Sequence, residues 1–173
     1  MAKGAAARAT GAKIPKGPLA ASMLMAEANM PPWIVVARGE LGVRDYPGPA
    51  YHPRIVEYLA TTGNQQNSDE TSWCSAFVNW CMIRANYRGT NNAAARSWLN
   101  WGQRLQAPRP GCVVVLWRES PNSWKGHVGF FDGWDVGQRV RLLGGNQGGG
   151  VDYDEVCVAT YPHERILGFR WPA

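Results

Sequence analysis

The sequence predicts an α+β fold, with helices in the first part of the domain and an antiparallel sheet in the second. Between residues 31 and 107, apolar side chains recur at helical spacing and the runs end at glycine. After the turn-forming stretch 108–111, the pattern changes to short β-branched runs separated by turn residues. Helices followed by a series of strands is the element order of α+β proteins.

Four helices are expected in the first part, and the third is expected to be central. They span residues 31–42, 52–60, 72–86 and 93–101. Pro31 and Pro32 suit the first turn of the first helix. The third helix is apolar on most of its circumference, which is typical of a helix enclosed by other elements.

About five strands are expected in the second part. They span residues 112–117, 127–131, 139–144, 151–160 and 166–171. The connections between them are short and contain turn residues, such as Asp132-Gly133 and the glycine run 148–150. We therefore expect an antiparallel meander in which successive strands are neighbours.

Charge divides the chain into a basic N-terminal segment and a nearly neutral domain. The 173 residues carry a net charge of +5, and 45% of them are hydrophobic, as in an ordinary globular domain. Residues 1–30 carry +3 of this charge, which leaves +2 for residues 31–173. We expect residues 1–30 to be flexible, and residues 31–173 to form a domain that is not basic enough to indicate nucleic-acid binding.

Cys74 lies where a polar, turn-prone lead-in meets the third helix. The first turn of a helix has free N–H groups and the positive end of the peptide dipole, and both favour a thiolate. Cys74 is therefore the candidate nucleophile. Cys81 lies two turns deeper in the same helix and is expected to be an inert core thiol.

Among the three histidines, His127 is the best candidate for the base that a cysteine nucleophile needs. It begins an expected strand, and Gly126 and Gly129 leave room near its ring for a substrate or another chain segment. His52 starts a helix and His163 lies in a loop near the C-terminus, so neither pattern points to catalysis.

The strand after His127 leads into Asn146 and Gln147, whose side-chain amides can hold an imidazole. In a meander this strand lies beside that of His127. An amide oxygen that accepts the imidazole N–H fixes its tautomer, as Asn does in Cys-His-Asn proteases. Asn146 is the expected orienting residue, and Gln147 is the reserve.

Three stretches carry these residues: 73–77 (Trp-Cys-Ser-Ala-Phe), 126–129 (Gly-His-Val-Gly) and 144–147 (Gly-Gly-Asn-Gln). Together they resemble the papain-like cell-wall amidases of the CHAP and NlpC/P60 superfamily, above all its small phage-associated and secreted bacterial members. The resemblance covers about residues 32–171. It implies a papain-like fold with the nucleophile helix packed on an antiparallel sheet, and hydrolysis of an amide bond in peptidoglycan stems without a cofactor.

The resemblance implies that Cys74 is the nucleophile, His127 the base and Asn146 the orienting residue, with the Cys74 N–H in the oxyanion hole. The further candidates for substrate binding or the oxyanion hole are Trp73, Asp69, Glu70, Gln147 and Gly126. Many CHAP members have a glutamate where this chain has Gly144. NlpC/P60 members usually have Asp where this chain has Trp73, which makes Asp69 or Glu70 the candidates to cap the helix or line the cleft.

The four cysteines predict neither a metal site nor a disulfide framework. A site built from Cys74, Cys112, Cys157 and His127 would lack any local chelating pair, so no metal is expected. A Cys112–Cys157 bridge is the alternative to the free buried thiols that we expect. The N-terminus has no signal-peptide pattern, and no stretch is long enough to span a membrane.

Two other functions compete with the amidase hypothesis. A glycosidase would need facing carboxylates, with Glu40 as the acid and Asp69 or Glu70 as its partner, although Glu40 is more simply a solvated helix residue. A non-catalytic module would grip glycan with tryptophans, and the three catalytic stretches argue against it.

The amidase hypothesis leaves the bond and the biological setting open. The enzyme could be an N-acetylmuramoyl-L-alanine amidase or an endopeptidase. It could act as a phage endolysin, or as a secreted antibacterial effector with a cognate immunity protein. In each case we expect a monomer without a signal peptide that binds peptidoglycan and acts in the periplasm or on the cell wall.

Overall fold

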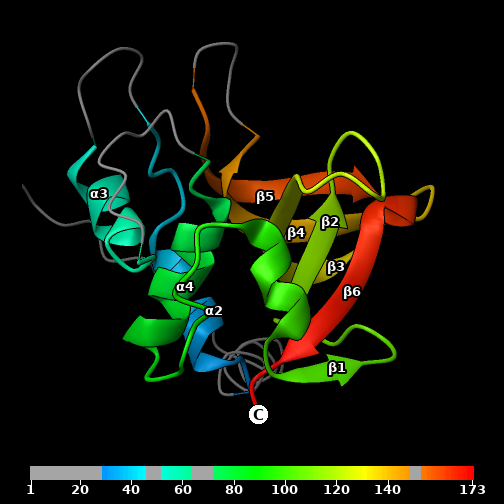
Figure 1. Ribbon diagram of the computed structural model, residues 1–173, viewed down its shortest axis with the longest axis horizontal. Helices are drawn as coiled ribbons and strands as arrows, with labels where there is room; N and C mark the ends of the chain where they lie inside the picture. Colours follow the sequence, from blue (N-terminus) through cyan, green and yellow to red (C-terminus); the bar gives the residue numbers. More distant parts are fainter. Residues whose placement is uncertain (1–28, 46–51, 64–71, 149–152) are drawn as a thin grey trace, which may run out of the picture. The chain divides into compact units, whose positions relative to one another are not determined.

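The helix α4 packs against a sheet on one side and two shorter helices on the other (Figure 1). The computed structural model describes residues 29–45, 52–63, 72–148 and 153–173. Its helical elements are α2 (Pro32–Gly39), α3 (Pro53–Leu59), α4 (Cys74–Arg84) and the 3₁₀ turns η1 (Ala95–Asn100) and η2 (His163–Arg165). Its strands are β1 (Gln103–Leu105), β2 (Val113–Trp117), β3 (Gly126–Asp135), β4 (Arg139–Gln147), β5 (Glu155–Pro162) and β6 (Ile166–Trp171). These elements confirm the predicted α+β class.

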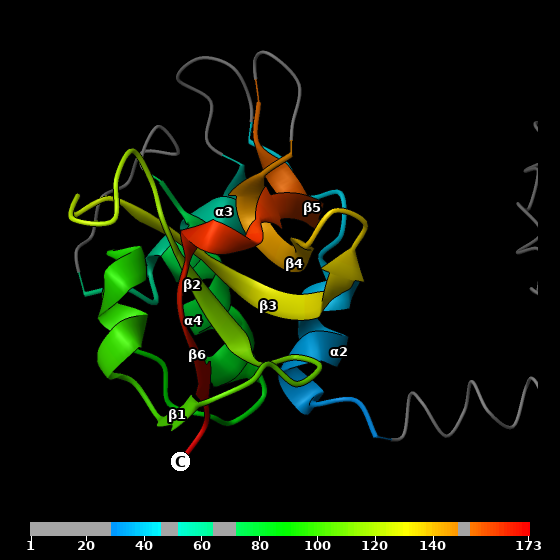
Figure 2. The same cartoon turned by 90° about the vertical axis from the view of Figure 1, so that its right-hand side faces the viewer.

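In the described residues the sheet has six antiparallel strands in the order β1-β6-β2-β3-β4-β5. The expected meander runs from β2 to β5, and β6 returns to lie beside β2 (Figure 2). The prediction of about five strands missed β1. This strand has three residues, two of them exposed, so it lacks the alternating pattern that identifies longer strands. The fourth expected helix is the 3₁₀ turn η1.

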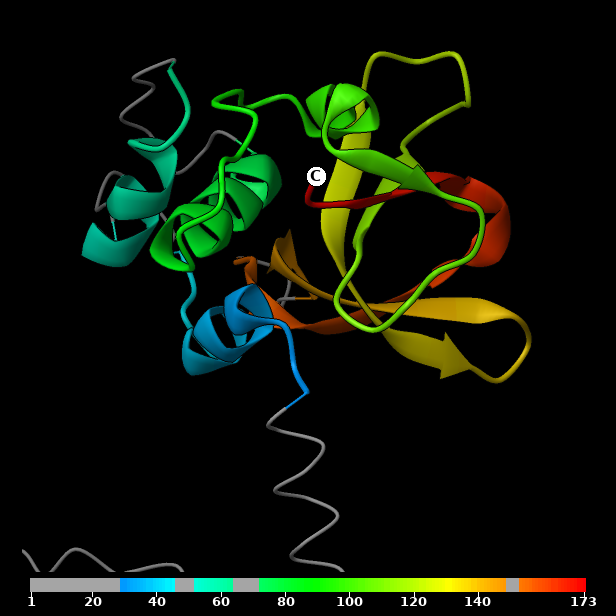
Figure 3. The ribbon, with the colours of Figure 1, turned by 90° about the horizontal axis from the view of Figure 1, so that it is seen from below.

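The central position predicted for the third helix is confirmed by the burial of α4. Every residue from Cys74 to Met82 is buried. Phe77 of α4 contacts Phe130 of β3, with ring centroids 6.4 Å apart, while Tyr58 of α3 packs against Trp80 on the other side. Figure 3 shows α2, α3 and α4 together on one side of the strands. Because α4 is enclosed, its first residue is held firmly against the sheet.

A second apolar cluster lies on the face of the sheet opposite to α4. Its buried members are Cys112, Val114, Leu116, Phe131, Val140 and Leu142. Side chains from β1, β5 and β6 pack on the same cluster. Since β1 and β5 are the two edges of the sheet, the sheet must curl around this cluster. His127 lies on this face, opposite Leu116 of the neighbouring strand.

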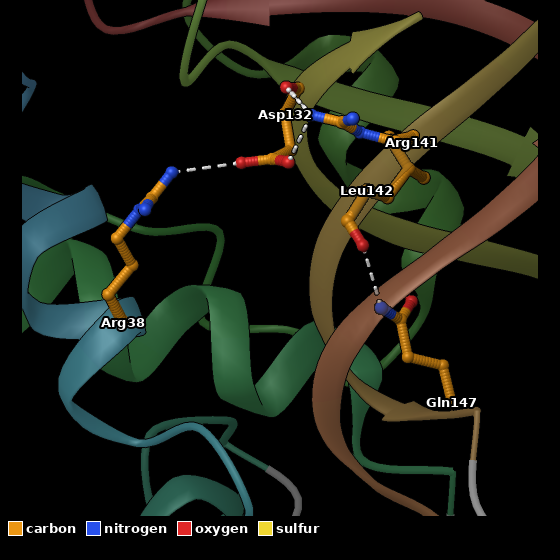
Figure 4. Close-up of polar contacts among 5 residues, drawn as sticks. All are labelled: Arg38, Asp132, Arg141, Leu142 and Gln147. Atoms are coloured by element: carbon orange, nitrogen blue, oxygen red, sulfur yellow. Dashed lines mark hydrogen bonds and ion pairs between the residues drawn. The ribbon is translucent and has the colours of Figure 1, made fainter. Parts of the chain in front are cut away.

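An ion-pair network connects a helix to the sheet. Asp132 of β3 pairs with Arg38 of α2 at 3.0 Å and with Arg141 of β4 at 2.9 Å, which ties α2 to the sheet (Figure 4). Cys112 and Cys157 are free thiols. In the described part of the chain, no helix has the length and apolarity needed to cross a membrane.

Candidate active site

Cys74 is the first residue of α4, and its side chain is buried. Trp73, the N-cap residue, still has a non-helical backbone, so the positive end of the helix dipole lies at Cys74. Cys81 is buried as well, and burial raises the pKa of its thiol well above the ordinary value. The two thiols of α4 therefore differ in their readiness to ionise.

The pKa of Cys74 is lowered although the residue is buried. Burial raises this pKa, but a hydrogen bond with His127 and the electrostatic interaction with that ring outweigh burial and lower it to about 7. The Ser72 hydroxyl, 3.6 Å from the Cys74 sulfur, and the charge of Arg118 act in the same direction. A thiol whose pKa is lowered toward neutral pH forms the thiolate more readily than an ordinary cysteine, which suits a nucleophile.

Gln147 holds the ring of His127. His127 is 1% exposed, and its Nε2 lies 2.7 Å from Gln147 Oε1. The orientation of the Gln147 amide is fixed, because its nitrogen donates to the carbonyl oxygen of Leu142 at 2.8 Å (Figure 4) and to that of Cys157 at 2.7 Å. The amide oxygen therefore faces the ring, and the imidazole donates its Nε2–H.

Tyr161 and Arg118 complete the surroundings of the imidazole. The Tyr161 hydroxyl donates to Gln147 Oε1 at 3.0 Å and lies 3.3 Å from His127 Nε2. Arg118 Nη2 lies 3.3 Å from His127 Nδ1. A guanidinium only donates, so this contact requires a lone pair on Nδ1. The proton thus stays on Nε2, and Nδ1 is the nitrogen that can accept a proton from Cys74.

Asn146 does not make the contact with His127 that the sequence predicts. Its Oδ1 accepts the Trp73 N–H at 3.0 Å, and its Nδ2 donates to Asp154 at 2.6 Å. Asp45 closes a ring of hydrogen bonds: it accepts the Asp154 N–H at 2.7 Å and the Trp73 indole N–H at 3.3 Å. The expected orienting contact is made by the reserve residue, Gln147, and the Asn146 ring of bonds fixes the residue that precedes Cys74.

The backbone at Asn146 explains this exchange. Asn146 has φ +58°, a left-handed conformation that asparagine tolerates, and the pairing of β4 with β5 is irregular between Gly144 and Gln147. In a regular strand Asn146 would share the face of Gly144 and Gln147 would lie on the other face. The irregularity reverses this order. A Cβ on Gly144 would lie 2.9 Å from Gln147 Oε1, so the glycine leaves the space that the amide occupies.

Two of the other predicted site residues serve the packing of the domain, and two lie outside the residues that the structure describes. Trp73 is fully buried and packs against Tyr58, with ring centroids 6.0 Å apart, so its ring is part of the core. A Cβ on Gly126 would lie 2.9 Å from the Leu116 carbonyl oxygen, so its small size serves the packing of β2 and β3. Asp69 and Glu70 lie outside the described residues.

Glu40, the acid of the glycosidase alternative, is a buried carboxylate and not the solvated helix residue expected from the sequence; it pairs with Arg54, whose side chain is 40% exposed. The Glu40 side chain accepts the Tyr58 hydroxyl at 2.5 Å and lies 3.1 Å from Arg54 Nε. Glu40 is 9% exposed. A carboxylate held in this way joins α3 to the end of α2.

Sequence reasoning did not identify four residues of the site. They are Arg118, Tyr161, Asp45 and Asp154. The sequence offered an indication for Arg118 alone among these four. It directly follows an expected strand that must pair with the strand of His127, so its proximity to His127 could have been predicted. The others come from distant segments whose meeting depends on the curl of the sheet.

Comparison with known proteins finds a family match over part of the chain. Residues 65–146 match the sequence model of the CHAP domain, a range that includes Cys74, His127 and Asn146 and ends one residue before Gln147. No curated protein and no solved structure matches the chain. The match confirms the resemblance carried by the three sequence stretches over residues 65–146, and the α+β fold is compatible with a papain-like CHAP fold.

Proposed function

We propose that this protein is a peptidoglycan hydrolase that cleaves an amide bond of the peptide stem. Cys74 acts as nucleophile, His127 as base, and Gln147 holds the imidazole. The observation that supports this most directly is the meeting of His127 with Cys74 at the start of a buried helix, with the imidazole Nε2–H held by Gln147. The CHAP match supports the bacterial cell wall as the substrate.

The first half of the reaction forms a thioester. The Cys74 thiol gives its proton to His127 Nδ1, and the thiolate attacks the carbonyl carbon of the scissile amide. The Cys74 N–H, which lies at the helix start, stabilises the oxyanion of the tetrahedral intermediate. His127 then gives its proton to the departing amine as the C–N bond breaks.

The second half releases the acid. A water molecule gives a proton to His127 Nδ1 and attacks the thioester carbonyl carbon. The C–S bond breaks, and the proton returns to Cys74 to regenerate the thiol. Throughout, Gln147 Oε1 accepts the Nε2–H and stabilises the ring when it is positively charged.

The chemical nature of the new ends in digested sacculi tests this proposal. Purified sacculi are incubated with the wild type and with Cys74→Ala, and the soluble fragments are analysed by mass spectrometry. We expect new amine ends, without new reducing sugar ends, in the wild-type digest alone. The fragment masses also identify the bond, and so distinguish an N-acetylmuramoyl-L-alanine amidase from an endopeptidase.

The same experiment addresses the two alternatives with one further variant. New reducing ends that persist in Cys74→Ala and disappear in Glu40→Gln would support the glycosidase. Binding to sacculi without any new ends would support a non-catalytic module. Either result would overturn the amidase proposal.

Gln147→Ala and Asn146→Ala are expected to separate an orienting role from a structural one. Without Gln147 the ring loses the acceptor that positions it, and we expect kcat to fall about 10²-fold. Asn146→Ala leaves the buried Trp73 N–H without its acceptor, and we expect a loss of about 1–3 kcal/mol of stability. Initial rates and urea unfolding of both variants check this. Loss of kcat at unchanged stability in Asn146→Ala, with full activity in Gln147→Ala, would return the orienting role to Asn146.

Two biological settings suit a stem-cleaving enzyme of this kind. As a phage endolysin it would act on the wall of the host, and as a secreted antibacterial effector it would act in the periplasm of a neighbouring cell. The effector would need an immunity protein that covers Cys74. A holin gene beside this one supports the first setting, and a small gene whose product inhibits the enzyme supports the second.

A further inference from the structure

Arg118 brings a permanent positive charge to the catalytic pair. It directly follows β2, and its N–H donates to the Lys125 carbonyl oxygen at 3.3 Å, which fixes the start of the β2–β3 loop. From there its guanidinium reaches to 3.3 Å from His127 Nδ1, the nitrogen to which the proposed mechanism assigns the proton of Cys74. Unlike the buried His127, Arg118 is exposed, so a bound molecule can reach it.

Three arginines of the described residues pair with carboxylates, and Arg118 is not among them. Arg38 and Arg141 pair with Asp132, and Arg54 pairs with Glu40 and Glu57. Among the ion pairs of the described residues, none involves Arg118. A guanidinium has five N–H donors in a planar fork that fits a carboxylate. One of these groups points to Nδ1, which leaves others for a ligand.

The position of Arg118 blocks one step of catalysis unless a ligand draws its guanidinium away. His127 takes the proton of Cys74 on Nδ1, and Arg118 Nη2 lies 3.3 Å from that nitrogen. The guanidinium N–H thus occupies the lone pair that must accept the proton. A carboxylate that pairs with the guanidinium would draw the N–H away from Nδ1.

We propose that Arg118 is a specificity-determining residue that binds a carboxylate of the substrate next to the scissile amide. The inference rests on the proposed function and narrows it: the preferred stem carries a free carboxylate, and not a carboxamide, within one residue of the bond that is cut. Peptide stems with glutamate and diaminopimelate offer such groups. A bidentate contact between the guanidinium and the carboxylate would position the carbonyl group of the scissile amide. It would also leave Nδ1 free to accept the proton of Cys74.

Two pairs of reagents that differ only in carboxylate against carboxamide test this proposal. The first pair is iodoacetate and iodoacetamide, which alkylate Cys74. The second is a stem peptide with free carboxylates and its amidated counterpart. Both are applied to the wild type, Arg118→Gln, Arg118→Lys and the control Lys125→Gln, which removes an exposed cation from the same loop.

For each pair, the preference is the rate with the carboxylate member divided by the rate with the carboxamide member. We expect this ratio to be about 10-fold or more higher in the wild type than in Arg118→Gln. For the peptides, Arg118→Gln should lose kcat/KM on the carboxylate form and retain it on the amidated form, within about 3-fold. Arg118→Lys should fall between the two, because it keeps the charge without the fork. Lys125→Gln should keep the wild-type ratios.

Several results would overturn the inference. One is a ratio of carboxylate to carboxamide rates in Arg118→Gln that equals the wild-type ratio. Another is an equal loss of kcat/KM on both peptides, which would mean that Arg118 acts only through His127. If neither peptide nor sacculi is cleaved while the iodoacetate preference depends on Arg118, the anion site stands and the proposed function fails. If the peptides are cleaved without a carboxylate preference, the function stands and the inference fails.

Discussion

Cys74→Ala is expected to reduce amide hydrolysis by roughly 10⁶-fold. Without the sulfur no thioester forms, and neither His127 nor the helix dipole has a nucleophile to activate. The rate of release of amine ends from sacculi measures the loss. Circular dichroism and urea unfolding check that the fold persists, with Cys74→Ser as a second variant that keeps a side chain of similar size.

Cys81→Ala is the matched control, since it removes a thiol from the same buried helix two turns away. It should keep the rate and lose about 1–2 kcal/mol of stability, because the deleted sulfur leaves a small cavity. Substantial hydrolysis by a folded Cys74→Ala protein would rule out the thiol mechanism.

His127→Ala is expected to lower hydrolysis about 10³-fold and to raise the pH at which Cys74 becomes reactive. The thiolate is the form that reacts with iodoacetamide, so the alkylation rate rises with pH through the pKa of Cys74, which is about 7 in the wild type. Burial raises this pKa and His127 lowers it. Removing the ring leaves burial dominant, so the midpoint should move upward, and alkylation at pH 7 should become slower.

The alkylation rate at a series of pH values gives this midpoint directly. The control is His163→Ala, because His163 is an exposed histidine beside Glu164 in η2 and is not part of the candidate active site. This control should have the wild-type midpoint and rate. An unchanged midpoint in His127→Ala would mean that the ring does not stabilise the thiolate, and would remove His127 from the role of base.

The two residues with the clearest local patterns were predictable from the sequence. A polar lead-in followed by an apolar helix marks Cys74 as the first residue of a buried helix, and the structure places it there. A short β-branched run after a turn marks the strand that begins near His127, and β3 begins at Gly126. Hydrophobic periodicity is a local property of the chain, and it identifies elements as long as they are not too short.

The choice between Asn146 and Gln147 could not be made in this way. A strand with regular alternation would send Asn146 toward His127, and one residue in a left-handed conformation reverses the faces. Its position in the irregular pairing of β4 with β5 depends on both strands. Asparagine is compatible with such a conformation but does not require it, so the residue type alone leaves the assignment open.

By itself, the sequence determined the order of helices and strands, the position of Cys74 at a helix start and the family that the three stretches resemble. Only the tertiary structure decided which amide holds His127, how Asn146, Asp154 and Asp45 fix the residue before Cys74, and that Arg118 and Tyr161 meet the same ring. The physical reason is that local periodicity sets elements, whereas hydrogen-bond partners far apart in the chain are set by register, bulges and the curl of the sheet.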